Sequence, residues 1–157
     1  MRILLILAIL SVSCSVRDLE PQKESAFKVK WHTFSEGHAL ALKTKKLIFM
    51  DVFADWCYPC KVMDYDVFNQ KEISDYLEKN FISIRVDYEN DIPLACGGKL
   101  KDAKLCLDED WRASGQISAL PFLAILSSDG RRIFSHTGQM NKQDLLLVLQ
   151  EIVLEYD

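Results

Sequence analysis

Two cysteines separated by two residues, Cys57 and Cys60, are the side chains best suited to chemistry in this chain. They follow the apolar run Leu47 to Phe53 and stand at the start of a predicted helix. Free backbone N–H groups and the positive end of the helix dipole favour a thiolate there, so we expect Cys57 to have a lowered pKa and to attack disulfides. Cys60, one turn later, can close a small ring with Cys57. The spacing indicates a reversible dithiol/disulfide couple, although zinc sites use the same spacing.

The residues beside the cysteines favour the redox interpretation over the metal site. Pro59 restricts the backbone inside the ring and lacks an N–H donor near the thiols. Trp56 either shields the site or packs as an ordinary, partly buried aromatic residue. Because they flank the sulfur atoms, Trp56, Tyr58 and Pro59 are the candidate substrate-binding residues on this side of the site.

The segment from Trp56 to Lys61 reads Trp-Cys-x-Pro-Cys-Lys and resembles the thioredoxin superfamily. Asp51 stands where thioredoxins carry a buried aspartate at the end of a strand, and Leu120-Pro121 looks like the cis-proline of that family. Within the superfamily, residues 50–57 are most similar to the C-terminal domain of the thiol:disulfide interchange protein DsbD. The resemblance covers roughly residues 28–156. It implies an α/β, thioredoxin-like fold, with a mixed central β-sheet flanked by helices.

We expect specific roles for Asp51 and for the Leu120-Pro121 pair. A carboxylate buried in an apolar strand is costly and its pKa rises, so we interpret Asp51 as the proton acceptor for Cys60, acting through water. The resemblance implies that the peptide bond before Pro121 is cis. It also implies that the backbone there lies against Cys57 and pairs with an incoming substrate peptide. From the residues alone, Pro121 could equally be a trans proline at the start of a strand.

Composition fits one small domain. The chain has 157 residues, of which 49% are hydrophobic, which is enough for a single core without metal clips. The net charge of −4 gives no electrostatic case for binding nucleic acid. We predict no cofactor and no metal site for the redox interpretation.

The N-terminus is typical of an export signal. Arg2 is followed by the apolar run Ile3 to Leu10, which is too short to span a bilayer. Cleavage after Ser13 suits an ordinary signal peptidase. It also suits a lipoprotein pathway in which Cys14 is lipidated, although Leu10 is one place upstream of the usual lipobox leucine. We expect lipidation, with residues 1–13 as signal peptide and 14–27 as a tether that holds the protein to a membrane on the periplasmic side.

Hydrophobic patterning predicts the elements of the remaining domain, residues 28–157. Strands are expected at Lys28–Phe34, Leu47–Phe53 and Phe81–Asp87, and a hairpin at Phe122–Leu126 and Arg132–His136 around an Asp-Gly turn. Helices are expected at Ser35–Lys45 with Ser35 as N-cap, at about Cys57–Phe68, at Lys71–Lys79, at Trp111–Gly115 and after Asn141.

Residues 88–110 are longer than the usual connection of a minimal thioredoxin, and we interpret them as an insertion. They contain Cys96 and Cys106, the two cysteines that remain once Cys14, Cys57 and Cys60 are assigned. In an oxidising compartment such a pair normally closes, so we expect a structural disulfide. A second redox pair that relays electrons to Cys57, or two free thiols, are the alternatives.

These observations predict a periplasm-facing thiol:disulfide oxidoreductase that reduces disulfide-bearing protein substrates. An upstream electron donor must then recycle it, for which a membrane thiol:disulfide interchange protein is the candidate. A disulfide oxidase or isomerase is the alternative within the same class. A zinc-binding, non-catalytic lipoprotein is the alternative outside it, with Cys57, Cys60, Cys96 and Cys106 as a four-thiolate site.

Overall fold

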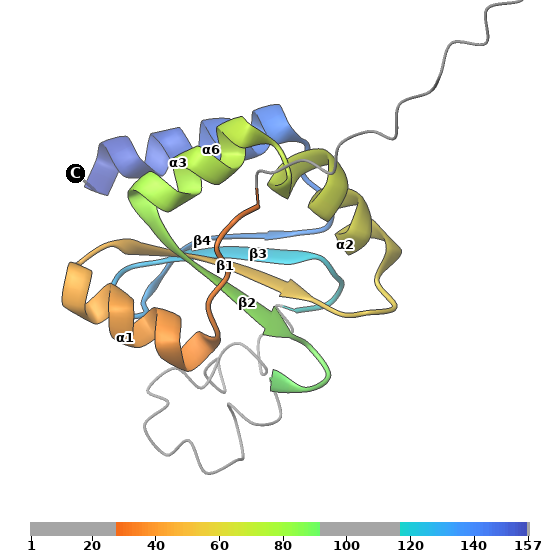
Figure 1. The fold of residues 1–157 in the computed structure, drawn as a ribbon, viewed down its shortest axis with the longest axis horizontal. Coiled ribbons are helices and arrows are strands. Elements are labelled where there is room, and N and C mark those ends of the chain that lie inside the picture. The colour runs from red at the N-terminus through yellow and green to blue at the C-terminus, as the bar shows by residue number, and fades with distance from the viewer. Residues whose placement is uncertain (1–27, 92–116, 157) are drawn as a thin grey trace, which may run out of the picture.

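A four-stranded mixed sheet forms the centre of the protein (Figure 1). The computed structural model describes residues 28–91 and 117–156. The strand order is β2-β1-β3-β4, with β1 at Leu47–Phe53, β2 at Phe81–Asp87, β3 at Phe122–Leu126 and β4 at Arg132–Thr137. β1 runs parallel to β2 and antiparallel to β3, and β4 returns antiparallel to β3. The predicted mixed sheet is confirmed.

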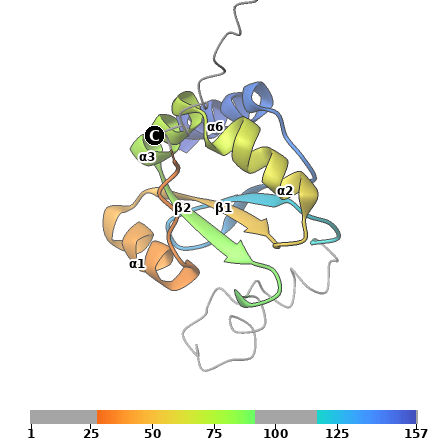
Figure 2. The same cartoon turned by 45° about the vertical axis from the view of Figure 1, so that its right-hand side comes forward.

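Helices cover both faces of this sheet (Figures 1 and 2). The helix α1, Phe34–Thr44, lies on one face. The other face carries α2 (Tyr58–Met63), the π-helix η1 (Asp64–Phe68), α3 (Lys71–Asn80) and α6 (Lys142–Tyr156). The chain therefore has the helix–sheet–helix layering expected of a predominantly buried sheet.

Side chains of β1 alternate between two hydrophobic clusters. Ile48, Met50 and Val52 pack in the cluster that includes Ala41 of α1. Phe49 points to the opposite face, into the larger cluster formed by α2, η1, α3 and α6. Because residues 49 and 51 share a face, Asp51 is on the side covered by α2, η1, α3 and α6.

The segment before α1 differs from the prediction. The expected strand Lys28–Phe34 is wrong, because only His32 forms a bridge, to Ile84 of β2. Thr33, rather than Ser35, is the N-cap of α1, and it forms a capping box with Glu36. The helix therefore begins at Phe34 and ends the extended segment early.

The C-terminal elements follow the prediction closely. The hairpin β3–β4 turns through Ser128-Asp129-Gly130, where Gly130 has a φ of 91°. Asn141 caps α6, since its Oδ1 accepts a hydrogen bond of 2.9 Å from the Asp144 N–H. Leu145, Leu149 and Ile152 are buried on the inner face of α6.

Several expected features lie outside the described residues. These are the signal peptide and tether at 1–27, most of the insertion at 88–110, and the helix at 111–115. Among the helices at 28–91 and 117–156, none combines the length and the apolar character that crossing a membrane requires.

The cap of α1 gives a test with a control two residues away. Thr33→Ala removes the hydroxyl that accepts from the Glu36 N–H and donates to the Glu36 carboxylate at 2.8 Å. We expect the free energy of unfolding to fall by about 1 kcal/mol. Ser35→Ala, inside the first turn, should change it by less than about 0.5 kcal/mol. Urea unfolding measures both, and a larger loss for Ser35→Ala would restore Ser35 as the cap.

Candidate active site

The turn from β1 into α2 holds the cysteine pair. Cys57 and Cys60 are joined by a disulfide with an S–S distance of 2.03 Å and a Cα–Cα distance of 5.3 Å. Both residues are nearly buried, with exposed fractions of 2% and 3%. They pack with Ala54, and the partly buried side chains of Phe53 and Leu120 lie against them. The apolar surroundings keep water away from the sulfur atoms.

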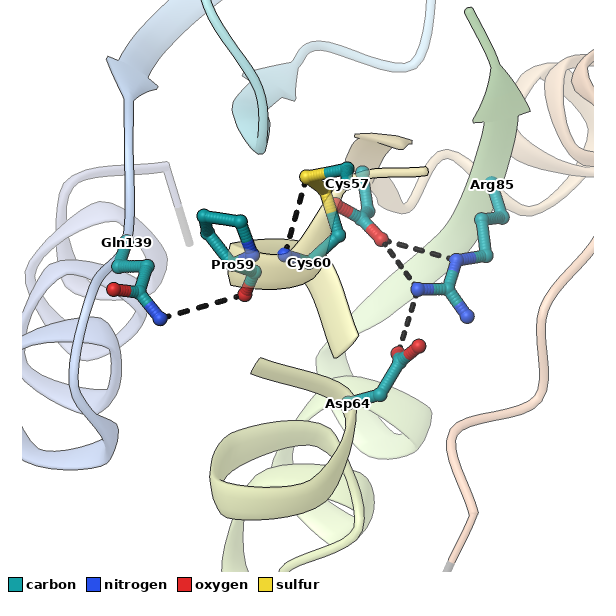
Figure 3. Close-up of a disulfide and its surroundings, with 7 residues drawn as sticks. Cys57, Pro59, Cys60, Asp64, Arg85 and Gln139 are labelled. Atoms are coloured by element: carbon teal, nitrogen blue, oxygen red, sulfur yellow. Dashed lines mark hydrogen bonds and ion pairs between the residues drawn. A yellow bond between two sulfur atoms is a disulfide. The ribbon is translucent and has the colours of Figure 1, made fainter. Parts of the chain in front are cut away.

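Cys57 is the N-cap of α2, and its sulfur accepts a hydrogen bond from the helix backbone. The Cys60 N–H donates a hydrogen bond of 3.2 Å to Cys57 Sγ, drawn as a dashed line in Figure 3. In the reduced protein, the same N–H can stabilise a thiolate on Cys57, because hydrogen bonds to a charged acceptor are stronger than those to a neutral one. The contact distinguishes Cys57 from Cys60 and suits Cys57 to nucleophilic attack.

The aromatic residues of the motif are exposed beside the disulfide. Trp56 is 63% exposed and Tyr58 is 75% exposed. The Trp56 indole Nε1 donates a hydrogen bond of 2.9 Å to Glu89 Oε1, which fixes the ring at the start of the segment that follows β2. Large exposed aromatic groups next to a reactive pair are suitable contacts for a protein substrate.

The loop before β3 closes a second side of the site. The peptide bond between Leu120 and Pro121 is cis, as the resemblance implied. Leu120 packs against the cluster that contains both cysteines. Pro121 is buried, and its carbonyl accepts a hydrogen bond of 2.8 Å from the Gly138 N–H. Leu120 is therefore adjacent to the disulfide.

Gln139, which sequence reasoning missed, lies on the Pro59 side of the disulfide (Figure 3). Its side-chain Nε2 donates a long hydrogen bond of 3.5 Å to the Pro59 carbonyl. Gln139 also lines a groove of about 480 Å³ between the active-site helix and the start of α6, together with Met63 and Met140. The groove adjoins the site without covering the sulfur atoms.

Asp51 is buried as expected, and it has a partner that was not expected. Only 1% of its surface is exposed. Its Oδ2 accepts a hydrogen bond of 3.0 Å from Arg85 Nε and lies 3.0 Å from an Arg85 terminal nitrogen. Within residues 28–91 and 117–156, nothing donates a hydrogen bond to the buried Oδ1. Burial raises the pKa of Asp51 from 3.8 to about 6, and the charge and hydrogen bond of Arg85 limit the rise.

Arg85, an interior residue of β2, is a site residue that the sequence did not single out. Its guanidinium group lies 4.4 Å from the ring centre of Phe53 and 5.1 Å from that of Trp31. A signal for the pairing was present, because Asp51 and Arg85 are each the fifth residue of a seven-residue strand. Parallel pairing of those strands from their first residues places the two side by side, and this is the observed register.

Asp64, the first residue of η1, also contacts Arg85. A terminal nitrogen of Arg85 donates a hydrogen bond of 2.6 Å to Asp64 Oδ1. Figure 3 shows Asp64 and Arg85 on the opposite side of the disulfide from Gln139. The nearby carboxylate adds to the rise in the pKa of Asp51. The prediction gave one continuous α-helix over this segment and did not anticipate the π-helix.

Three of the predicted site residues are not among those that the structure describes. Cys14, Cys96 and Cys106 lie outside the described residues. In the two described ranges, no three side chains of His, Cys, Asp or Glu are grouped so that they could hold a metal ion. The alternative four-thiolate site would need Cys96 and Cys106 in addition to the bonded pair.

A family model named Thioredox_DsbH, described as a protein of unknown function, DUF255, matches residues 22–152 of the chain. The match covers most of the 157 residues. The chain belongs to the Thioredox_DsbH family. No curated protein matches it.

Solved structures similar to this Thioredox_DsbH member share its fold. A thioredoxin from Thermus thermophilus is 16% identical, with a TM-score of 0.60 over 80% of this chain and 87% of that one. A structure titled DsbH oxidoreductase is 13% identical, with a TM-score of 0.59 over 88% and 94%. A disulphide isomerase from Xylella fastidiosa is 17% identical, with a TM-score of 0.53 over 81% and 98%. At these identities the likeness establishes the thioredoxin-like fold.

The raised pKa of Asp51 predicts a stabilising substitution. The folded-state pKa of about 6 is above the ordinary 3.8, so the folded chain binds this proton more tightly than the unfolded chain. Stability is therefore lost as the pH rises from about 4 to about 6, by at most ~3 kcal/mol. Asp51→Asn removes that cost but also removes the negative charge beside Arg85, so we expect a net gain of about 1–2 kcal/mol at pH 7.

Urea unfolding at pH 7 and pH 4 measures this effect. The gain from Asp51→Asn should shrink at pH 4, where Asp51 is largely protonated in the folded state. A variant that is less stable than the unmodified chain at pH 7, or a gain that is the same at both pH values, would contradict the raised pKa.

Proposed function

We propose that this Thioredox_DsbH protein is a thiol:disulfide oxidoreductase that works as a disulfide reductase. The observation that carries the proposal is the Cys57–Cys60 disulfide, with the Cys60 N–H bonded to Cys57 Sγ. The buried carboxylate of Asp51 supports it, because a buried acid with a pKa of about 6 can accept a proton near neutral pH.

The reaction begins with the reduced pair. The Cys57 thiolate attacks one sulfur of a substrate disulfide, the substrate S–S bond breaks, and the leaving thiolate takes a proton from water. Cys60 then gives its proton to Asp51 and attacks Cys57 Sγ. The mixed disulfide breaks, the second substrate sulfur leaves as a thiolate that takes a proton from water, and Asp51 releases its proton to solvent. Two electrons have passed to the substrate, and a donor dithiol must reduce the Cys57–Cys60 disulfide again.

The direction of electron flow is argued from the motif. The residues between the cysteines are Tyr58 and Pro59, and the Cys-Pro-His-Cys sequence associated with strong oxidants does not occur. The similarity of residues 50–57 to the C-terminal domain of DsbD also favours a reductase. An oxidase or isomerase remains the alternative, and the equilibrium potential of the pair separates them: near about −270 mV it is a reductant, near about −120 mV an oxidant.

In this proposal the protein acts outside the cytoplasm, on the periplasmic side of a membrane. The signal-like residues 1–13 and Cys14 support export and a lipid anchor on the periplasmic side. The partners would be disulfide-bearing proteins and, as electron donor, a membrane thiol:disulfide interchange protein. We also propose a structural disulfide between Cys96 and Cys106. One zinc ion bound tightly by the four cysteines of the purified reduced protein would contradict the redox function and favour the zinc-binding alternative.

Single cysteine variants test the order of the two steps. Cys57→Ser should abolish reduction of a model protein disulfide, because the nucleophile is missing. Cys60→Ser should instead accumulate a mixed disulfide with the substrate, because attack continues and resolution fails. Non-reducing gels and intact mass identify the trapped species. Trapping by Cys57→Ser rather than by Cys60→Ser would reverse the assignment.

The lipid anchor has an independent test. In a bacterial host that processes lipoproteins, the unmodified chain should partition into detergent, and its mass should correspond to a chain that starts at a lipidated Cys14. Cys14→Ser should partition into the aqueous phase while its disulfide reductase activity is retained. An unmodified N-terminus on a protein that stays in the aqueous phase would leave only an ordinary export signal.

A further inference from the structure

One guanidinium group serves two carboxylates behind the disulfide. Arg85 reaches Asp51 at 3.0 Å and Asp64 at 2.6 Å, and Figure 3 shows Arg85 and Asp64 joined on one side of the cysteine pair. The exposed fraction of the side chains increases along this series, from 1% for Asp51 to 20% for Arg85 and 40% for Asp64. The series links a carboxylate that water does not reach to one that it does.

The geometry of this series is fixed from several sides. Phe53 and Trp31 provide ring faces for the guanidinium group of Arg85. Asp64 is placed by η1, in which the Asn69 N–H bonds to the Asp64 carbonyl at 3.0 Å, five residues back rather than four. A π-turn of this kind shifts the direction of the residues around it, and such turns are frequent at functional sites.

We propose that Asp64 is a positioning residue for the resolving step: by sharing Arg85 with Asp51, it prevents a one-to-one ion pair and so keeps Asp51 able to take the proton of Cys60. The inference rests on the function proposed above. Asp64 touches neither the substrate nor the sulfur atoms in this role, and it acts through Arg85 alone.

The charges around Asp51 support this role. In the described part of the chain, the charges that act on Asp51 come from Arg85 on β2 and Asp64 on η1. The other elements packed around Asp51 present uncharged residues, which are Leu123 on β3 and the buried Cys60 and Met63 of α2. Arg85 lowers the pKa of Asp51 and Asp64 raises it. Without Asp64, the positive charge would act on Asp51 alone, and a carboxylate held in that way is a weaker base.

The chain offers a control for the charge itself. Asp66 lies in the same π-helix and is exposed, and its side chain lines the groove beside the site rather than the Arg85 cluster. Asp64→Asn and Asp66→Asn change the net charge equally in the same turn. Asp64→Glu keeps the charge at position 64 and tests whether the carboxylate itself is what matters.

The first measurement needs no turnover. Carbon-13 NMR of the Asp51 carboxyl group in the full oxidised chain gives its titration midpoint in each variant. Asp64→Asn should lower the midpoint by about 0.5 to 1 pH unit, whereas Asp66→Asn and Asp64→Glu should leave it near that of the unmodified chain. An unchanged midpoint in Asp64→Asn, or an equal decrease in Asp66→Asn, would overturn the proposal.

The second measurement follows the two thiol steps separately. In Asp64→Asn, formation of the mixed disulfide by Cys57 should be unchanged, and resolution by Cys60 should slow about twofold to threefold at neutral pH. The acid limb of its pH profile should move to lower pH with the Asp51 midpoint. A shifted midpoint with an unshifted resolving step would overturn the link to Cys60. Absence of any disulfide exchange in the unmodified chain, with the midpoint shifted, would instead reject the proposed function and leave the coupling in place.

Discussion

The burial of β1 on both faces is the constraint on which the site depends. Leu47–Phe53 lies between β2 and β3, with helices on both faces of the sheet, so the apolar side chains in its middle all enter hydrophobic clusters. A carboxylate at position 51 cannot reach water from there. The fold tolerates Asp51 because Arg85 stands beside it on β2, in hydrogen-bond contact. Removing Arg85 would leave Asp51 as an uncompensated buried charge, whereas Arg85 without Asp51 would still have Asp64 as a partner.

The choice of arginine at position 85 follows from geometry. Its planar fork lets Nε and a terminal nitrogen both reach Asp51 Oδ2, while a terminal nitrogen also reaches Asp64. The flat guanidinium group also lies over Phe53 and Trp31. A lysine ammonium group is a point charge and could not meet these demands together. Two carboxylates with one guanidinium leave an excess of negative charge behind the disulfide.

The sequence predicted most of the fold because its strongest signals are local. The bounds of β1 and β2 are those expected, since β1 is an apolar run broken only by Asp51 and β2 alternates apolar residues with Ser83 and Arg85. The errors lie where local signals compete. Thr33 and Ser35 are both good N-caps, and Thr33 caps because Glu36 stands three residues after it. In place of the expected strand Lys28–Phe34 there is a single bridge at His32, because the cap at Thr33 ends the extended segment.

The cysteine pair, Asp51 and Pro121 were predictable from the sequence and its resemblance, whereas the electrostatics of the site were not. The motif Cys57 to Cys60 and the burial of Asp51 follow from sequence neighbours, and the cis peptide before Pro121 follows from the resemblance to thioredoxins. Arg85 lies on β2 and Asp64 on η1, and both are distant in sequence from Asp51. Their contacts depend on strand register and on a π-turn, which no residue type predicts.

The electrostatics of the site matter for function, because proteins with one fold, the thioredoxin-like fold included, can differ in whether they reduce or oxidise disulfides. A thiolate that is strongly stabilised makes a pair oxidising, since it favours the reduced form. In the reduced form of this chain the Cys60 N–H can stabilise a thiolate on Cys57, while the excess negative charge of the Asp51–Arg85–Asp64 cluster would oppose thiolates. An opposition of this kind favours the disulfide form of the pair, which is consistent with the reductase proposed above.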